Sequence, residues 1–216
     1  MRRPASFVYL LLAAGPVSAD DKPRTFTFAK GDLNKVPAGW TAAQTGKGKS
    51  EWKVVADDTA PGKTGFALAQ ATADPNALFN LCVADDTSFQ DVEVAVAFKA
   101  NAGEKDQGGG VVWRYQDADN YYVARMNPLE DNFRVYKVVG GKRSPEFKNA
   151  DVKVPAGEWH ALKVTMVGDK IECFLDGKKH LEATDGTFGK AGKVGLWTKA
   201  DAQTSFDALT VKPLSK

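Results

Sequence analysis

The residues best suited to binding chemistry are three arginines and two tyrosines between residues 108 and 139. Two clusters of turn-forming residues, 117–120 and 128–131, divide this segment at hairpin length. The pattern predicts antiparallel strands over 110–116, 121–127 and 132–139. Since successive side chains of a strand point to opposite faces, one face should carry the polar set. Its expected members are Arg114, Gln116, Tyr121, Arg125, Asn127, Asn132, Arg134 and Tyr136.

Arginine on this face favours ligand binding, because its planar guanidinium can bind a pair of hydroxyl groups, a carboxylate or a phosphate through two hydrogen bonds. The expected ligand contacts are Arg114, Tyr121, Arg125, Arg134 and Tyr136. The alternative is a lattice of ion pairs in which Asp91, Glu93 and Glu172 neutralise the arginines. Exposed pairs of that kind contribute about 0–1 kcal/mol each and leave no role for a ligand.

The opposite face of the same three strands should belong to the hydrophobic core, interrupted only by Lys137. Its expected members are Val111, Trp113, Tyr115, Tyr122, Ala124, Met126, Phe133, Val135 and Val139. Pairing across the two turns sets Gln116 against Tyr121 and Asn127 against Asn132. That register places Arg125 between Val112 and Arg134.

Trp197 is a further candidate for the binding face, because it alternates with Val194 and Leu196 and shares its side of the strand with Lys199. An indole outside the core could form a flat platform on which a sugar ring stacks. The alternative is an edge tryptophan that a loop covers, for which residues 30–49 are the candidate.

The two cysteines are expected to be free thiols. Alternation in strand 170–176 places Cys173 in the core, whereas core residues Phe79, Leu81 and Val83 would point Cys82 to the other face. Side chains on opposite faces cannot form a disulfide without distortion.

Residues 1–19 have the form of a secretory signal, with Arg2 and Arg3 before an apolar run and Val17-Ser18-Ala19 at its end. Export to the periplasm or the cell exterior is therefore expected, and the run is too short to insert as a membrane anchor. The chain has 29 Lys and Arg against 27 Asp and Glu, so removal of the two leader arginines leaves no formal charge. A neutral domain lacks the basic surface that nucleic acid or anionic lipid would require.

The mature part, residues 20–216, reads as a single all-β domain and is expected to be a monomer. About a dozen short alternating segments recur between clusters of Gly, Asp, Asn and Pro, which is typical of an antiparallel sandwich or barrel.

Several motifs resemble the concanavalin A-like lectin/glucanase superfamily, and within it the laminin-G-like bacterial proteins of the 3-keto-disaccharide hydrolase domain family. They are Phe89-Gln90-Asp91-Val92-Glu93, Val111-Val112-Trp113-Arg114, Asn120-Tyr121-Tyr122, Trp159-His160-Ala161-Leu162, Phe174-Leu175-Asp176-Gly177, Val194-Gly195-Leu196-Trp197 and Ser205-Phe206-Asp207-Ala208-Leu209. The resemblance implies a jelly roll of two curved antiparallel sheets, with carbohydrate on the concave sheet. Its members include lectins, glycosidases, lyases and adhesion modules, so it predicts the fold more sharply than the activity.

Three functions follow from the residues and the resemblance together. The first is binding of a glycan or glycoside on the concave face. The second is cleavage of a 3-keto-glycoside, with Arg125 or Arg114 as electrophile and Glu93, Asp91 or Glu172 as base. The third is a laminin-G-like interaction module that binds no sugar.

No catalytic residue can be assigned from the sequence. The E-x-D-x-x-E spacing of retaining glucanases is absent, because Glu93 has Asp91 before it but no third acid after it. Both histidines, His160 and His180, lack a neighbouring Ser or Cys that would form a nucleophilic pair.

Asp207 is the candidate metal ligand, and no other cofactor is expected. The resemblance implies a structural calcium that ties the first and last strands together, and backbone carbonyls can supply most calcium ligands. The alternative is an aspartate that caps a loop through hydrogen bonds.

Overall fold

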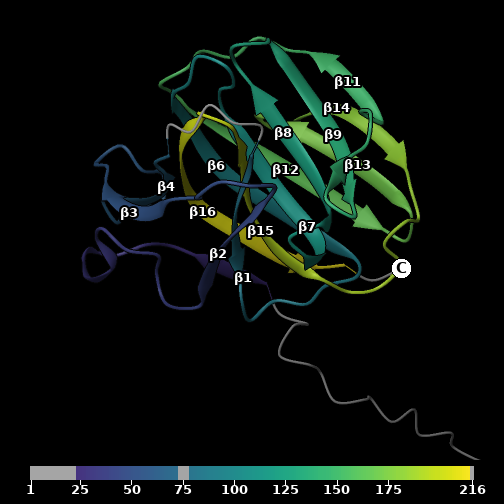
Figure 1. Ribbon diagram of the computed structural model, residues 1–216, viewed down its shortest axis with the longest axis horizontal. Helices are drawn as coiled ribbons and strands as arrows, with labels where there is room; N and C mark the ends of the chain where they lie inside the picture. The colour runs from purple at the N-terminus through teal and green to yellow at the C-terminus, as the bar shows by residue number, and fades with distance from the viewer. Residues whose placement is uncertain (1–22, 73–77, 215–216) are drawn as a thin grey trace, which may run out of the picture.

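The computed structural model describes residues 23–72 and 78–214, so the leader expected at residues 1–19 lies outside the described residues. The chain forms two curved antiparallel sheets packed face to face as a jelly-roll sandwich, in agreement with the sequence (Figure 1). Within the described residues the helical structure is a single 3₁₀ turn, Lys30–Asp32. No helix in this part of the chain is long and apolar enough to cross a membrane.

Sheet A contains the longest strands and joins both ends of the domain. In order across the sheet its strands are β14 (Lys178–Thr184), β13 (Lys170–Leu175), β12 (Trp159–Val167), β6 (Val92–Ala102), β16 (Gln203–Pro213), β4 (Phe66–Gln70) and β3 (Trp52–Ala56). The first strand, β1 (Arg24–Phe26), pairs with the last, β16.

Sheet B contains the three strands of the arginine-rich segment. In order its strands are β10 (Lys142–Arg143), β9 (Asn132–Val139), β8 (Asn120–Asn127), β7 (Gly109–Asp117), β15 (Lys193–Lys199), β5 (Phe79–Ala84) and β2 (Trp40–Thr45), while β11 (Lys148–Asp151) pairs with β9. The face of sheet B that points away from sheet A is called its outer face below.

The main core lies between the sheets and follows from period-two alternation. Residues Val111, Trp113, Tyr122, Ala124, Met126, Phe133 and Val135 are all buried there, as expected. Trp113 stacks on Tyr122 with ring centroids 5.5 Å apart. Lys137, the expected interruption, keeps its charge paired, since its Nζ lies 2.7 Å from Asp185 Oδ2.

A second hydrophobic cluster fills part of the outer face of sheet B. Its buried members are Leu81, Val83, Val112, Tyr121, Val123, Tyr136, Val138 and Trp197. Thr45 in edge strand β2 donates to Ala118 O and lies 2.8 Å from Tyr121 Oη, although three strands separate β2 from β8. Arg143 of the opposite edge, β10, lies 5.5 Å from the ring of Phe79 in β5. Sheet B therefore curls toward its outer face and closes over this cluster.

The predicted register of β8 is correct on one side and wrong on the other. Asn127 pairs with Asn132 and Arg125 with Arg134, as expected. On the β7 side, Arg125 pairs with Gly110 instead of Val112, and Gln116 does not pair with Tyr121. The cause is a β-bulge between Trp113 and Asp117, where Arg114 takes a φ of 45°.

The bulge also reverses which side chains point outward. Arg114 was expected on the outer face but turns away from it, and Tyr115, expected in the core, stacks on Tyr121 of the second cluster at 6.0 Å. Val139, also expected in the core, is 43% exposed near the end of its strand.

Both cysteines are free and buried, as expected, but the reason given by alternation was wrong. Cys82 and Cys173 lie in the same main core, whereas Leu81 and Val83 belong to the second cluster. Both faces of β5 are buried, so alternation could not distinguish inside from outside. Burial raises the pKa of both thiols well above the ordinary range.

Candidate functional site

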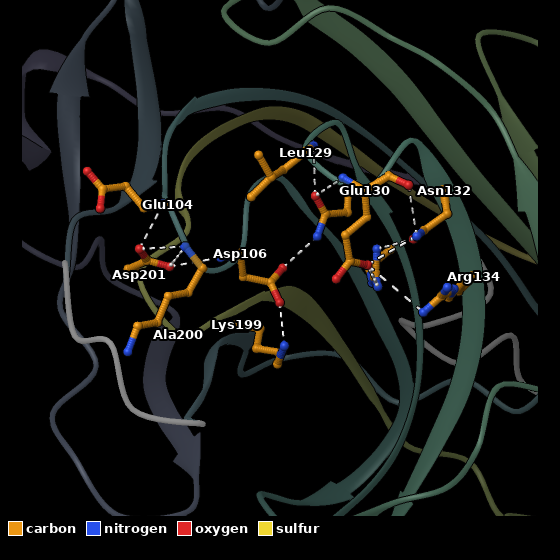
Figure 2. Close-up of polar contacts among 12 residues, drawn as sticks. Glu104, Asp106, Leu129, Glu130, Asn132, Arg134, Lys199, Ala200 and Asp201 are labelled. Atoms are coloured by element: carbon orange, nitrogen blue, oxygen red, sulfur yellow. Dashed lines mark hydrogen bonds and ion pairs between the residues drawn. The ribbon is translucent and has the colours of Figure 1, made fainter.

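Polar side chains gather at one end of the outer face of sheet B, where β8 and β15 end and β7 and β9 begin (Figure 2). We call this group the Arg125 cluster. It consists of Asp106, Arg125, Asn127, Glu130, Asn132, Arg134 and Lys199.

Arg125 is the centre of the cluster and only 3% exposed. Its Nη2 donates to Glu130 Oε2 at 2.8 Å and its Nη1 to Asn132 Oδ1 at 2.5 Å. The guanidinium carbon lies 6.0 Å from the ring centroid of Tyr136. Its buried Nε has no hydrogen-bond partner among the described residues. The site thus holds a fixed guanidinium whose Nε is the nitrogen without a partner among the described residues.

Glu130 explains why two arginines can lie side by side on adjacent strands. Its Oε2 is 2.8 Å from Arg125 Nη2 and 3.9 Å from Arg134 Nη1, so one carboxylate offsets both charges. Partial burial acts to raise the pKa of Glu130, but hydrogen bonds from Arg125 and Asn132 outweigh it and hold the pKa below its ordinary value.

The turn between β8 and β9 delivers Glu130 to this position. Asn127 Oδ1 accepts hydrogen bonds from the backbone N–H groups of Leu129 and Glu130, at 2.9 and 3.2 Å. An Asn that caps its own turn in this way fixes the backbone two and three residues on. The turn predicted at 128–131 is therefore part of the site.

Asp106 enters the cluster from the loop between β6 and β7. Its Oδ1 accepts from Asn127 Nδ2 at 2.9 Å and its Oδ2 from Lys199 Nζ at 2.5 Å. Burial raises the pKa of Asp106 above its ordinary value, although Lys199 and Arg125 act in the opposite direction. The result is a buried carboxyl group with an increased tendency to hold a proton.

Asp201 positions this loop. Its carboxylate accepts backbone N–H groups from Glu104, Lys105 and Asp106 in succession, at 2.8 to 3.0 Å (Figure 2). Partial burial acts to raise the pKa of Asp201, but these three hydrogen bonds outweigh it and lower the pKa. Gly103 begins the loop at a φ of 144°, and a Cβ there would lie 1.9 Å from Asp106 O. Only glycine fits at this position, so the backbone path of the loop is closely restricted.

The structure brings together three of the six predicted ligand contacts. Arg125, Arg134 and Tyr136 are neighbours, and Arg134 is the most accessible of the three, with 28% of its side chain exposed. Its Nε donates to Asn149 Oδ1 at 2.7 Å and its Nη1 lies 3.4 Å from Tyr136 Oη.

The other three predicted contacts lie outside the Arg125 cluster. Tyr121 and Trp197 are 0% and 1% exposed inside the second cluster, where Trp197 packs on Phe79 at 5.4 Å. The indole is thus covered by its neighbours in β2 and β5, and does not form an open platform. Arg114 lies away from the cluster, as described above for the bulge.

Among the described residues, the ion pair predicted for Arg114 is present, whereas Arg125 and Arg134 are neutralised by Glu130 and not by the predicted acids. Asp91 Oδ1 lies 3.3 Å from Arg114 Nη2. Glu93 and Glu172 instead pair with Lys163 and Lys179 on sheet A. Neither of these acids can act as a base beside Arg125, because the described partners of Arg125 are Asn132 and Glu130.

Sequence reasoning missed Asp106, Glu130 and Asp201. The sequence showed Glu130 only as part of a turn. It showed Asp106 only as a residue two positions before a run of glycines. Lys199 had a detectable signal, since alternation placed it on the same side of its strand as Trp197.

Comparison with known families places this geometry in context. Residues 32–212 match the family model described as a 3-keto-alpha-glucoside-1,2-lyase-like domain. The chain belongs to this lyase-like family. The resemblance noted in the sequence is thereby confirmed. No curated protein sequence gives a significant match.

Solved structures share the fold of this lyase-like domain. The carbohydrate-binding module CBM66 from Bacillus subtilis superposes with a TM-score of 0.64 and 22% identity, over 81% of this chain and 95% of that one. Domain 4 of AbnA, a GH43 extracellular arabinanase from Geobacillus stearothermophilus, in complex with arabinotriose, gives 0.54 and 13%, over 88% and 92%. A structure described as a native glycosidic hydrolase gives 0.57 and 11%, over 92% and 99%. At these identities the likeness concerns the fold.

One observation supports the metal site implied at Asp207, and another supports the alternative of a loop cap. Asp207 is fully buried, and its Oδ2 accepts the backbone N–H of Gly62 at 2.6 Å, which makes it a cap for the loop after β3. Its Oδ1 has no hydrogen-bond partner among the described residues. Those residues contain no group of three or more His, Cys, Asp or Glu side chains able to hold a metal ion. A calcium ion bound through backbone carbonyls needs no such group, so calcium at Asp207 stays a prediction.

Proposed function

We propose that this lyase-like domain is an exported, monomeric β-sandwich that binds a glycan or glycoside at the Arg125 cluster. The observation that carries the proposal is the layered arrangement of charge. Arg134, Lys199 and Glu130 have 28%, 25% and 38% of their side chains exposed, above a buried layer of Arg125 and Asp106. Buried partners hold the exposed groups in place, and pre-organised donors and acceptors reduce the entropy that binding costs.

Each predicted residue has a defined part in this proposal. Arg134 contacts the ligand directly, while Arg125 supplies its unused Nε after a small adjustment and holds Glu130. Tyr136, Tyr121 and Trp197 form the apolar support beneath. Arg114 has no direct part, because it lies on the other side of the sheet.

Related proteins support a saccharide as the ligand. One similar structure is named as a carbohydrate-binding module, and another was solved with arabinotriose. The family description refers to a keto-glucoside. The neutral charge of the chain without its leader suits an uncharged, hydroxyl-rich ligand better than a polyanion.

A second candidate function, cleavage of a 3-keto-glycoside, is favoured by Asp106. In a 1,2-elimination a carboxylate takes the proton from C2, which the 3-keto group acidifies. The C2–H electron pair then forms the C1–C2 double bond, and the C1–oxygen bond breaks with protonation of the leaving oxygen. Asp106 is a buried carboxyl group with a raised pKa, which suits a base, and Arg125 could polarise the keto oxygen.

One experiment tests both functions. The mature protein is titrated calorimetrically with a panel of oligosaccharides, and p-nitrophenyl 3-keto-α-glucoside is assayed for release of nitrophenol. We expect glycan binding that Arg134→Ala weakens by about tenfold or more, the effect of losing a charged hydrogen bond. Lys163→Ala is the matched control, since Lys163 is an exposed cation on sheet A.

The outcomes separate the candidates. Nitrophenol release that Asp106→Asn abolishes would establish the lyase reaction. Binding without turnover would support the binding module. If the folded protein binds no member of the panel and cleaves nothing, both are wrong and the sugar-free interaction module is favoured.

A further inference from the structure

The other end of sheet B carries a hollow that neither the proposed site nor the predicted contacts use. It has a volume of about 580 Å³ and lies where β7 ends and β15 begins. A neighbouring hollow of about 500 Å³ shares Gln116 with it. We call the two together the Gln116 groove. The side chains relevant to binding are Asp85, Asp86, Tyr115, Gln116, Lys190 and Lys193.

The Gln116 groove is separate from the Arg125 cluster. Lys193 begins β15 and lies in the groove, whereas Lys199 ends β15 and lies in the cluster. At about 3.3 Å per residue, the six residue steps between them span roughly 20 Å. The second hydrophobic cluster, which includes Trp197, fills the face between the two ends.

Arg114 does not line the groove, but it holds segments next to it in place. Its guanidinium donates to Gln90 O at 2.7 Å, Phe188 O at 2.8 Å and Gly168 O at 2.6 Å, in addition to its contact with Asp91. It is 1% exposed, so these bonds form out of water and tie three separate segments together. One of them, at Phe188, belongs to the groove wall.

Gly192 fixes the opposite wall. Its backbone exchanges hydrogen bonds with Phe89 in both directions, at 2.9 and 3.0 Å. A Cβ at this position would lie 2.5 Å from the carbonyl carbon of Arg114 and 2.6 Å from Gln116 Nε2, so only glycine allows this close approach. The same Nε2 donates to Ala191 O at 3.1 Å. The groove is therefore pre-formed.

The groove combines mixed polar groups with one aromatic side chain. Asp85 and Asp86 are balanced by Lys190 and Lys193, and Lys193 Nζ lies 3.7 Å from Asp85 Oδ1. Balanced charges disfavour a strongly charged ligand, because either sign would meet repulsion from half of the groups. Tyr115 adds a ring held by stacking on Tyr121. Its pKa is raised by burial, which keeps its hydroxyl a neutral donor and acceptor.

We infer that the Gln116 groove is a second carbohydrate site, which binds an uncharged oligosaccharide independently of the Arg125 cluster. Both volumes fall within the range of about 300–1,000 Å³ that is usual for small-ligand sites. Gln116, Asp86 and the lysines offer donors and acceptors at the rim, and Tyr115 offers an apolar ring face.

Amide chemical shifts of the ¹⁵N-labelled mature protein provide the test, with cellotriose, maltotriose, xylotriose and inulotriose as probes. We expect at least one probe to shift the amides of residues 85–88, 115–116 and 190–193. Asp86→Ala should weaken this binding by about tenfold, the ratio expected for one lost charge-assisted hydrogen bond, and Gln116→Ala should weaken it less, because a neutral amide forms a weaker hydrogen bond. Asp86 is exposed, so Asp86→Ala should leave the melting temperature unchanged, whereas Gln116→Ala also removes the Nε2 hydrogen bonds to Arg114 O and Ala191 O and should lower it slightly.

Two control measurements test whether the groove binds independently of the Arg125 cluster and whether it prefers an uncharged ligand. Arg134→Ala should leave the shifts at the groove intact, even if it removes those near residues 125–134. Tri-galacturonic acid, a charged probe, should bind the groove more weakly than the best neutral probe.

The inference is overturned if none of the neutral trisaccharides shifts the groove amides. It is equally overturned if Arg134→Ala abolishes those shifts, or if the charged probe binds more tightly. A failure of the Arg125 cluster to bind sugar would leave the groove result standing, so the two proposals fail separately.

Discussion

The outer faces of the two sheets carry the same kinds of alternating charged residues but use them differently. On sheet A, Lys163 pairs with Glu93 at 3.5 Å and Lys179 with Glu172 at 2.8 Å, and these four side chains are 32–45% exposed. On sheet B, Arg125 is 3% exposed and pairs with Glu130 beside the second hydrophobic cluster. The first face is a solvated lattice, and the second is a closed network.

This difference between the two faces indicates which charged residues should be tested for a role in function. Exposed Lys–Glu pairs contribute about 0–1 kcal/mol and are replaceable. A buried arginine incurs a desolvation penalty that such a pair does not, and its removal leaves its partners unsatisfied. Sheet B also curls toward its outer face, which accounts for the burial of residues that alternation alone would expose.

The largest effect should come from Arg125→Ala, which breaks the closed network at its centre. Glu130 and Asn132 would each lose a charge-assisted hydrogen bond. We expect the free energy of unfolding to fall by about 2–3 kcal/mol and ligand binding to weaken by about 2–4 kcal/mol. Urea denaturation and calorimetric titration measure the two effects.

This expectation differs from what the sequence suggests. If Arg125 simply faced the like charge of Arg134, its removal would leave stability unchanged or slightly better. Because Glu130 lies between the two guanidinium groups, removal of Arg125 should instead lower the stability. An Arg125→Ala protein as stable as the parent would show that the Glu130 contact contributes nothing in solution.

A somewhat smaller loss is expected for Asp201→Ala, which removes the acceptor of three backbone N–H groups. The loop before Asp106 should loosen, at a cost of about 1–2 kcal/mol in the free energy of unfolding. Binding at the Arg125 cluster should weaken although Asp201 has no contact with Arg125. Asp201→Asn is the informative control, because an amide oxygen retains part of the acceptor capacity and should restore part of both properties.

The sequence was sufficient for the fold, because most strands have one clearly apolar face. The alternation in β8 placed Tyr122, Ala124 and Met126 in the core, where the structure has them. The errors have two local causes. A bulge after Trp113 shifted the register by two residues, and β5 is buried on both faces. This bulge is stabilised by tertiary contacts of Arg114. The alternation of residue types along one strand does not show such contacts.

The candidate site was predictable only in part for a similar reason. Arg125 and Arg134 share a strand pair and were placed by alternation. Asp106 and Asp201 come from loops whose positions depend on contacts between segments about 95 residues apart in the chain. No local periodicity reports such contacts, so the loop half of the site required the structure.

Asp207→Asn tests a deeply buried carboxylate on sheet A and should have a moderate effect. The amide would accept the Gly62 N–H less strongly, so the melting temperature should fall, with a loss of about 1 kcal/mol. Ligand binding should be unchanged. If calcium is bound at this residue, a chelator should lower the melting temperature of the parent and not that of the variant. Unchanged melting together with abolished ligand binding would contradict a structural role.

The smallest effect is expected for Lys179→Ala on the solvated lattice of sheet A. Lys179 Nζ lies 2.8 Å from Glu172 Oε1 and 2.9 Å from Glu182 Oε2, but 39%, 45% and 67% of the Glu172, Lys179 and Glu182 side chains are exposed. Water replaces the lost contacts, so the free energy of unfolding should stay at the parental level. High salt should reduce any residual difference, because it screens exposed charges. Binding at both sites on sheet B should stay at the parental level. A loss on the scale expected for Arg125→Ala would show that the two faces do not differ in kind, and that burial of the arginine is not what makes its network important.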